Sequence, residues 1–435
     1  MAAGGAVGLV AALVLAMAGC RSSTESDAAP TTTIRFWHTF NEAETATMIE
    51  LIDGFQREHP DIRVEVTVLS FGSGRNRLLE AMRSGHAPDL ARAEVAWIPE
   101  FADAGLVEDV SSEVELEAHV ASIRPFFQWK GGTWAWPQAV DGLVLFYNVE
   151  QLAAAGQRPP GTMDELVRVG AALTVDAEGQ SSLSATFDDA RVARHGLYLK
   201  ADGYMFLPFL WAFGGGTMDV ERGEVMIGDG SSTKAARFMM DLRDRFGVAL
   251  AQTDFSRDYE DELQRFGEGR VAMIINGPWA TADILARPAF AEPGNLGIAP
   301  LPTGPGGSGG SPIGGHGYVI PKGHGQEAVR TLARYLSSPA AQQRSATKNH
   351  ILPTLESVYA DPAIQQNRTT AAFRAALAGS HGRAVFPGMA RMFDALTPAI
   401  QRILRREVEP EVAFATVAEE WREILVRARA VEPPR

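Results

Sequence analysis

The sequence predicts an α/β protein with two domains. Its first elements read strand, helix, strand over residues 34–68, an order that places parallel strands in one sheet with a right-handed crossover. Residues 271–275 form a short, continuous apolar run after a helix-like segment, as a strand buried on both faces does. The chain has 435 residues, 46% of them hydrophobic, which is long enough for two domains.

The composition excludes several kinds of partner. The formal net charge is −13, and a chain this acidic repels phosphate backbones, so we expect no nucleic-acid partner. Cys20 is the only cysteine, so no intrachain disulfide can form. The histidines are scattered without the spacing of metal ligands, and no Walker loop occurs. We therefore expect neither a metal nor a cofactor.

The first residues have the pattern of a secretory leader. Residues 6–18 are apolar but too short to span a bilayer, and they are typical of a signal-peptide core. The small residues Ala18 and Gly19 before Cys20 resemble a lipobox, which implies cleavage before Cys20 and a diacylglycerol on its sulfur. The alternative is a plain secretory signal with an unrelated cysteine.

We accordingly expect a signal peptide over residues 1–19, a lipid anchor at Cys20 and a flexible tether over residues 20–32. Residues 1–19 contain no Lys or Arg, so the true translation start is expected upstream.

The elements of the first half follow from periodicity. Met48, Leu51, Ile52 and Phe55 lie on one helical face, and Pro60 ends that helix. Apolar and polar residues alternate from residue 62 to 68, as in a strand. The other elements expected in this half are a short helix near 78–82, strands at 90–95 and 143–148, and a helix at 163–173.

The elements of the second half also follow from periodicity. The sequence predicts helices at 233–245 and 329–336, strands at 271–275, 295–300 and 317–321, and an almost wholly helical segment from 371 to 430. Residues 303–317 are rich in Gly, Pro and Ser and are expected to form a loop. No segment after the leader is apolar enough to span a membrane.

The stretch from Phe266 to Trp279 places an aromatic side chain at a sheet edge. Gly267 and Gly269 release the chain from a helix, the buried strand follows, and Asn276-Gly277-Pro278 stops it. Ligand crevices of open α/β sheets lie at the carboxyl ends of their strands. Trp279 is therefore expected at a ligand site, although an arbitrary tryptophan is more often a core residue.

The sequence matches to catalytic motifs lack the secondary structure that those motifs require. Residues 306–310 match G-x-S-x-G, but they lie in a Gly/Pro loop without the strand and helix that a nucleophile elbow needs. Nothing singles out a pair of glycosidase carboxylates among the many acidic residues. We expect no catalytic residues.

The stretch 266–279 resembles the signature of the extracellular solute-binding proteins that feed ABC sugar importers, in particular the maltose/maltodextrin-binding group. Further stretches resemble the same group in the same order: 36–39, 85–90, 92–97, 137–148, 201–204, 295–302 and 314–316. The resemblance implies a periplasmic-binding-protein-like fold, with two α/β lobes that close over a ligand cleft about hinge crossings.

The resemblance also implies a division of the chain. The N-terminal lobe would hold residues 33–140 and 301–338, and the C-terminal lobe residues 141–300 and 339–435. Crossings are expected near 140–141, 301–302 and 337–340. The last helices would pack on the second lobe and reach back across the cleft.

A sugar needs flat aromatic platforms for its C–H faces and polar groups for its hydroxyls. By resemblance, Trp279 and Tyr204 would stack on sugar rings, and Arg383 would donate two hydrogen bonds. The remaining candidates are Glu94, Asp141 and Asn41 for hydroxyls and Trp97 as a third platform. Alternatively, Asp141 and Arg383 belong to a hinge or an interlobe ion pair. Trp211 is expected in the core.

Some positions depart from the maltodextrin binders. Ala384-Val385 follow Arg383 where Pro and then Trp are usual, Phe213 stands where a Glu is frequent, and Asn41 replaces a frequent Asp. The sugar therefore stays open between maltose, longer maltodextrins, trehalose and another oligoglycoside.

We expect a monomeric, lipid-anchored extracytoplasmic receptor that delivers an oligosaccharide to the transmembrane subunits of an ABC permease. The alternatives are a secreted glycan-processing enzyme, and the same clamp with a non-sugar cargo such as a polyol phosphate or a peptide.

Overall fold

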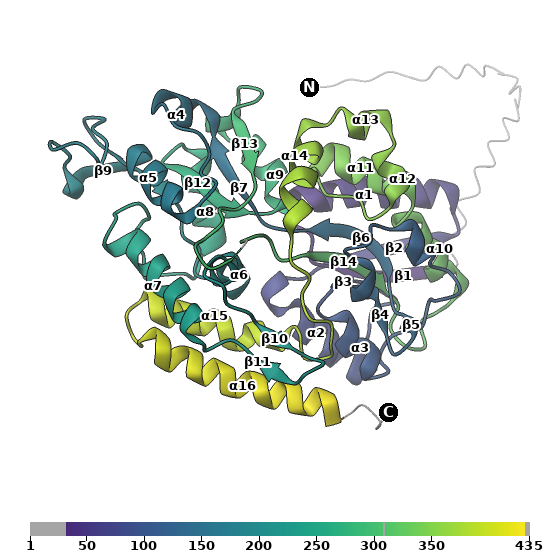
Figure 1. Ribbon diagram of the computed structural model, residues 1–435. Helices are drawn as coiled ribbons and strands as arrows, with labels where there is room; N and C mark the ends of the chain where they lie inside the picture. Colours follow the sequence, from purple (N-terminus) through teal and green to yellow (C-terminus); the bar gives the residue numbers. More distant parts are fainter. Residues whose placement is uncertain (1–31, 308, 431–435) are drawn as a thin grey trace, which may run out of the picture.

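Two five-stranded sheets, each surrounded by helices, lie side by side in the computed structural model (Figure 1). It describes residues 32–307 and 309–430. The expected signal peptide, Cys20 and the tether up to residue 31 lie outside these residues. Within the described part of the chain, no helix combines the length and apolar character needed to cross a membrane.

The first sheet has the order β2-β1-β3-β14-β6. Its strands are β1 (Thr32–His38), β2 (Ile62–Val68), β3 (Leu90–Glu94), β6 (Trp136–Asp141) and β14 (Gly314–Val319). β1 is parallel to β2 and β3, whereas β14 is antiparallel to both β3 and β6. The ends of β1, β2, β3 and β6 and the start of β14 therefore share one edge.

The second sheet has the order β13-β7-β12-β9-β8. Its strands are β7 (Val144–Asn148), β8 (Val175–Asp176), β9 (Val192–Leu197), β12 (Val271–Asn276) and β13 (Leu296–Ala299). β12 is parallel to β9 and antiparallel to β7, so the ends of β9 and β12 share an edge with the start of β7. Every residue of β12 is buried, as the apolar run predicts.

Helices of the first lobe cover both faces of its sheet. They are α1 (Glu42–Glu58), α2 (Phe71–Arg83), α3 (Ile98–Asp103), α10 (Glu327–Leu336) and α11 (Pro339–Asn349). α1 begins with a capping box, because the side chain of Asn41 accepts from the Glu44 amide and the side chain of Glu44 accepts from the Asn41 amide. Its apolar face packs with β1 and α10 in one buried cluster.

The second lobe carries more helices. They are α4 (Val149–Ala154), α5 (Met163–Leu173), α6 (Gly203–Ala212), α7 (Gly230–Asp244), α8 (Asp258–Gly267), α9 (Thr281–Leu285), α14 (Arg368–Ala376), α15 (Arg391–Leu404) and α16 (Pro410–Ala430). Its short hairpin strands are β10 (Met218–Asp219) and β11 (Glu224–Val225). The first lobe has the short strands β4 (Gln128–Trp129) and β5 (Gly132–Thr133) beside α3, and α12 (Glu356–Tyr359) and α13 (Pro362–Gln365) pack on α11.

The last helices pack on the second lobe, as expected. Phe206 of α6 stacks on Phe414 of α16 with ring centroids 5.4 Å apart, and the Trp421 indole donates to the Met392 carbonyl at 3.0 Å. They also reach the first lobe, because Arg391 of α15 donates to Glu100 of α3 at 2.6 Å. α15 and α16 lie below the second sheet in Figure 1.

The chain crosses between the sheets at their facing edges. β6 ends at Asp141 and β7 begins at Val144, so residues 142–143 join the two edges. A second crossing runs from the end of β13 to the start of β14. We expected a third crossing at residues 337–340, but α11 still packs against α1, where Arg344 and Lys348 pair with Glu50. The chain therefore stays beside the first lobe beyond residue 340.

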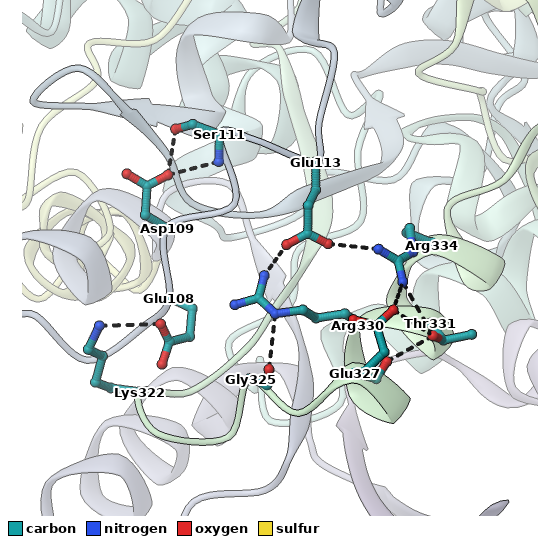
Figure 2. A network of polar contacts seen from close by, with 10 residues as sticks. All are labelled: Glu108, Asp109, Ser111, Glu113, Lys322, Gly325, Glu327, Arg330, Thr331 and Arg334. Atoms are coloured by element: carbon teal, nitrogen blue, oxygen red, sulfur yellow. Dashed lines mark hydrogen bonds and ion pairs between the residues drawn. The ribbon is translucent and has the colours of Figure 1, made fainter.

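A polar network holds the outer part of the first lobe together (Figure 2). Glu113 accepts from Arg330 and, at 3.1 Å, from Arg334, both on α10. Lys322 pairs with Glu108 at 3.2 Å. These contacts fix the loop after α3 against α10 and the segment before it.

Candidate ligand-binding cleft

The expected site residues gather where the two sheet edges face each other. Asn41, Glu94 and Asp141 lie at or just beyond the carboxyl ends of β1, β3 and β6. Tyr204 and Trp279 follow β9 and β12 in the second lobe. This is the position of ligand crevices in open α/β sheets.

Glu94 and Arg383 form a buried ion pair. Nη2 of Arg383 donates to Oε1 of Glu94 at 2.6 Å, and the side chains are only 7% and 12% exposed for Arg383 and Glu94. Nε of Arg383 donates to the Ile313 carbonyl at 2.8 Å, and Oε2 of Glu94 accepts from the Ala96 amide at 2.8 Å. The pair joins the first sheet to the segment between α14 and α15, so both residues are engaged with each other in this conformation.

Tyr204 lies beside this pair. Its amide donates to the N-cap carboxylate of Asp202 at 2.8 Å, and its hydroxyl donates to the Pro312 carbonyl at 3.1 Å. The Arg383 guanidinium lies 5.4 Å from the centre of the Tyr204 ring, within the range of a cation–π contact. Burial raises the pKa of the Tyr204 hydroxyl, which therefore remains a donor at neutral pH.

Asp141 contacts a histidine that was not among the predicted site residues. Oδ2 of Asp141 lies 2.9 Å from Nδ1 of His316, and both side chains are buried. Burial, with Arg92 nearby, lowers the pKa of His316, so the imidazole is neutral at pH 7. His316 stands opposite Glu94 in the β14–β3 register. The resemblance marked residues 314–316 as a whole, but it assigned His316 no role.

Asn41 connects the two lobes. Its Oδ1 caps α1 by accepting from the Glu44 amide at 2.8 Å, while its Nδ2 donates to the Trp279 carbonyl at 2.9 Å. The Trp279 ring is half-buried and lies against Gly277, where an added Cβ would stand 2.6 Å from Cε3 and closer to Cζ3 and Cη2. Gly277 thereby allows the position of the ring.

Trp97 is buried and is not the open stacking platform that was expected. It is 5% exposed and lies beneath Phe71, with ring centroids 5.6 Å apart at 35°. It therefore presents no free face in this conformation. Phe71, which is 55% exposed, was missed, because an apolar residue at the start of a helix gives no sign of whether it faces the core or the cleft.

Trp211 also differs from expectation. It is half-buried rather than a core residue, and it stacks on His381 with centroids 4.4 Å apart at 26°. His381 and Arg383 belong to the same segment, and each covers an aromatic residue of α6. This segment therefore packs against α6 at the candidate site.

A buried carboxylate supports the turn that carries Trp279. Glu262 is fully buried, accepts from Nδ2 of Asn276 at 2.6 Å and lies 3.7 Å from the Lys200 ammonium. Burial raises its pKa to about 7. Among residues 32–307 and 309–430, no group of three or more His, Cys, Asp or Glu side chains could hold a metal ion.

Comparison with known proteins defines the class. The model of the family described as bacterial extracellular solute-binding protein matches residues 40–343. The chain belongs to this family, as the resemblance of its motifs predicted. Its two-lobed α/β fold is confirmed by solved structures of sugar-binding members.

Three proteins show how similar this chain is to receptors of known ligand. The GacH receptor of Streptomyces glaucescens, solved unliganded and with acarbose and an acarbose homologue, is 32% identical with a TM-score of 0.83, covering 91% of this chain and 99% of that one. The MalE domain of Bdellovibrio bacteriovorus bound to maltotriose shares the fold at a TM-score of 0.79 and 23% identity, covering 91% and 100%. A maltotriose-binding protein of Pyrococcus abyssi is 24% identical over 383 residues, which are 85% of this chain and 77% of that protein.

Proposed function

We propose that the protein is an extracytoplasmic receptor that binds an oligosaccharide of the maltose or maltodextrin type and delivers it to an ABC permease. The observation that carries the proposal is that two partly buried aromatic rings, Tyr204 and Trp279, lie with charged and polar groups at facing sheet edges. A pyranose offers apolar C–H faces and a rim of hydroxyls, and this set of side chains matches both.

The three relatives named above support an oligosaccharide as the ligand. The GacH receptor binds acarbose, and the Bdellovibrio and Pyrococcus proteins bind or are named for maltotriose. At 32% identity over most of both chains, the GacH receptor is the relative among these whose ligand class bears most on this chain.

Each cleft residue has a role in this proposal. Trp279 and Tyr204 stack on sugar rings, while Glu94 and Arg383 exchange part of their mutual contact for ligand hydroxyls. Because a buried charge left without a partner is costly, the ligand must satisfy both members of that pair. Asn41 holds the backbone of Trp279, and Asp141 orients His316.

No bond is made or broken in the proposed activity. The test is calorimetric titration of the purified protein with maltose, maltotriose, maltotetraose, trehalose and acarbose, followed by chromatography of the recovered sugars. Saturable binding of at least one sugar, recovered intact, is expected. Hydrolysis products would show that the protein is a glycan-processing enzyme rather than a receptor. Binding of glycerophosphocholine or a peptide, with no binding of any sugar, would overturn the carbohydrate assignment.

The pattern of the N-terminal residues supports a membrane-anchored place of action. Cleavage before Cys20, acylation of its sulfur and the tether over residues 20–32 would hold a monomeric receptor at the extracytoplasmic face of the cell membrane, beside its permease. Cys20→Ser should move the protein from the membrane fraction to the soluble one without changing sugar affinity. Retention of Cys20→Ser in the membrane fraction would contradict the lipid anchor.

A further inference from the structure

Phe71 presents an open aromatic face on the first lobe. It is the first residue of α2, just beyond the carboxyl end of β2, at the edge where the cleft residues gather. It is 55% exposed and is the only aromatic among the exposed large apolar side chains of the described residues. Trp97 lies 5.6 Å away and is 5% exposed, so it supports the Phe71 ring from below. The ring is thus held in place while remaining open to a ligand.

His316 supplies an unpaired acceptor beside this ring. Nδ1 of His316 lies 2.9 Å from Oδ2 of Asp141, and a carboxylate can only accept, so the imidazole proton is on Nδ1. Nε2 then carries a lone pair. It is buried and has no hydrogen-bond partner among the described residues. A buried acceptor without a donor is unfavourable, so Nε2 is suited to a donor that arrives with a ligand.

The ring and the acceptor are adjacent. The Phe71 and His316 ring centroids are 6.2 Å apart with the planes at 67°, so the edge of one ring meets the face of the other. The two acidic neighbours, Glu94 and Asp141, are balanced by Arg383, which pairs with Glu94, and by Arg92 near His316, so no unbalanced charge selects an ionic ligand. The arrangement suits a neutral ring with an apolar face and a hydroxyl on its rim.

We propose that Phe71 and His316 form a carbohydrate subsite on the first lobe, in which one pyranose ring stacks on Phe71 while a hydroxyl of that ring donates to Nε2 of His316. The subsite rests on the proposed function and adds two residues that determine specificity. It complements Trp279 and Tyr204, which reach the cleft from the second lobe.

Variants of the exposed residue carry the test, because they leave the core intact. The probe is whichever of maltose, maltotriose, maltotetraose, trehalose and acarbose the wild type binds most tightly, and its affinity is measured by calorimetry for the wild type, Phe71→Ala, Phe71→Leu and Phe71→Trp, with the melting temperature of each. Loss of an aromatic stacking partner should weaken binding about 2- to 10-fold in Phe71→Ala. Phe71→Leu, which is apolar but not aromatic, should lose most of that factor, and Phe71→Trp should retain affinity.

The matched control is Leu183→Ala, which truncates a side chain that is 67% exposed on the loop after β8. Its affinity should equal that of the wild type. If Phe71→Ala and Phe71→Leu also bind like the wild type, the subsite is wrong while the proposed function stands. If the wild type binds no sugar of the panel, the proposed function fails and the subsite fails with it.

The pairing of the two residues has its own test. His316→Leu removes the acceptor and should also weaken binding. Because both residues are assigned to one sugar ring, the loss in the double variant with Phe71→Ala should be smaller than the product of the single losses. Losses that multiply independently would contradict a shared ring.

Discussion

Gly277→Ala should weaken ligand binding without unfolding the protein. Gly277 has φ −121° and ψ −177°, an extended conformation that alanine adopts readily, so the substitution causes no backbone strain. A Cβ at this position would lie 2.6 Å from Cε3 of Trp279, whereas ordinary contact begins at 3.4 Å. The indole must therefore move by at least about 0.8 Å.

The size of the effect follows from the stacking that is disturbed. A well-placed aromatic contact contributes about 0.5–1.5 kcal/mol beyond its buried area, which corresponds to about a 2- to 10-fold change in dissociation constant. The bond from Asn41 to the Trp279 carbonyl involves the backbone and should persist. We therefore expect a loss of affinity in this range, together with a shifted tryptophan emission.

Calorimetric titration with the best ligand of the wild type measures the effect, and thermal unfolding checks the fold. Gly230→Ala is the control, because a Cβ there meets nothing within 4 Å and α7 lies outside the cleft. Affinity unchanged in Gly277→Ala, with the control also unchanged, would refute the claim that the position of the Trp279 ring matters for binding.

Three further predictions concern the cap, the buried carboxylate and the ion pair. Asn41→Asp keeps the oxygen that caps α1 but removes the donor to the Trp279 carbonyl, so it should weaken binding at nearly unchanged stability, whereas Asn41→Ala should also cost about 0.5–2 kcal/mol of stability in urea unfolding; equal stability of both variants would contradict the cap. Burial raises the pKa of Glu262 from 4.5 to about 7, so between these pH values the folded chain binds more protons at Glu262 than the unfolded chain does. The contribution of the protonated carboxyl to the free energy of unfolding is complete below pH 4.5 and is lost as the pH rises through 7. Glu262→Gln should therefore gain about 2–3 kcal/mol relative to the wild type between pH 5 and pH 8, and parallel pH profiles of the two proteins would refute the shift. Arg383→Ala leaves Glu94 buried without its cation and should cost about 3–5 kcal/mol, less when combined with Glu94→Gln; additive losses in that double-mutant cycle would show that the two side chains are not coupled.

Much of the fold could be predicted from local pattern. The apolar run 271–275 indicated a strand buried on both faces, and β12 is such a strand. The periodicity of residues 163–173 matches α5 at both ends. β6 was not recognised as a strand, because Pro137 and polar residues interrupt its pattern. Pro137 is tolerated in this strand because β6 is at the edge of the sheet. α6 was missed because it is apolar on all sides and contains Pro208, so it shows no helical period.

The site was predictable in part. The end of a buried strand predicts the place of Trp279 at a sheet edge, whereas Glu94 was predicted from the resemblance; the structure places both residues at the facing edges. Which way a side chain faces depends on packing between distant segments, which a local pattern does not encode. Trp97 and Phe71 illustrate this, because both lie at the same edge but only the second is open. The pairing of His316 with Asp141 depends on the antiparallel contact of β14 with β6, which joins segments about 175 residues apart.

The central claim is that a sugar binds in the cleft beside Trp279. The most direct measurement is titration of intrinsic tryptophan fluorescence with maltotriose, in the wild type and in Trp279→Phe. The variant is needed because the chain has eight tryptophans. The account predicts a saturable change in the wild type that is largely lost in Trp279→Phe, with calorimetry still detecting binding by the variant. A saturable change of the same size in both proteins would place the sugar away from Trp279 and contradict the account.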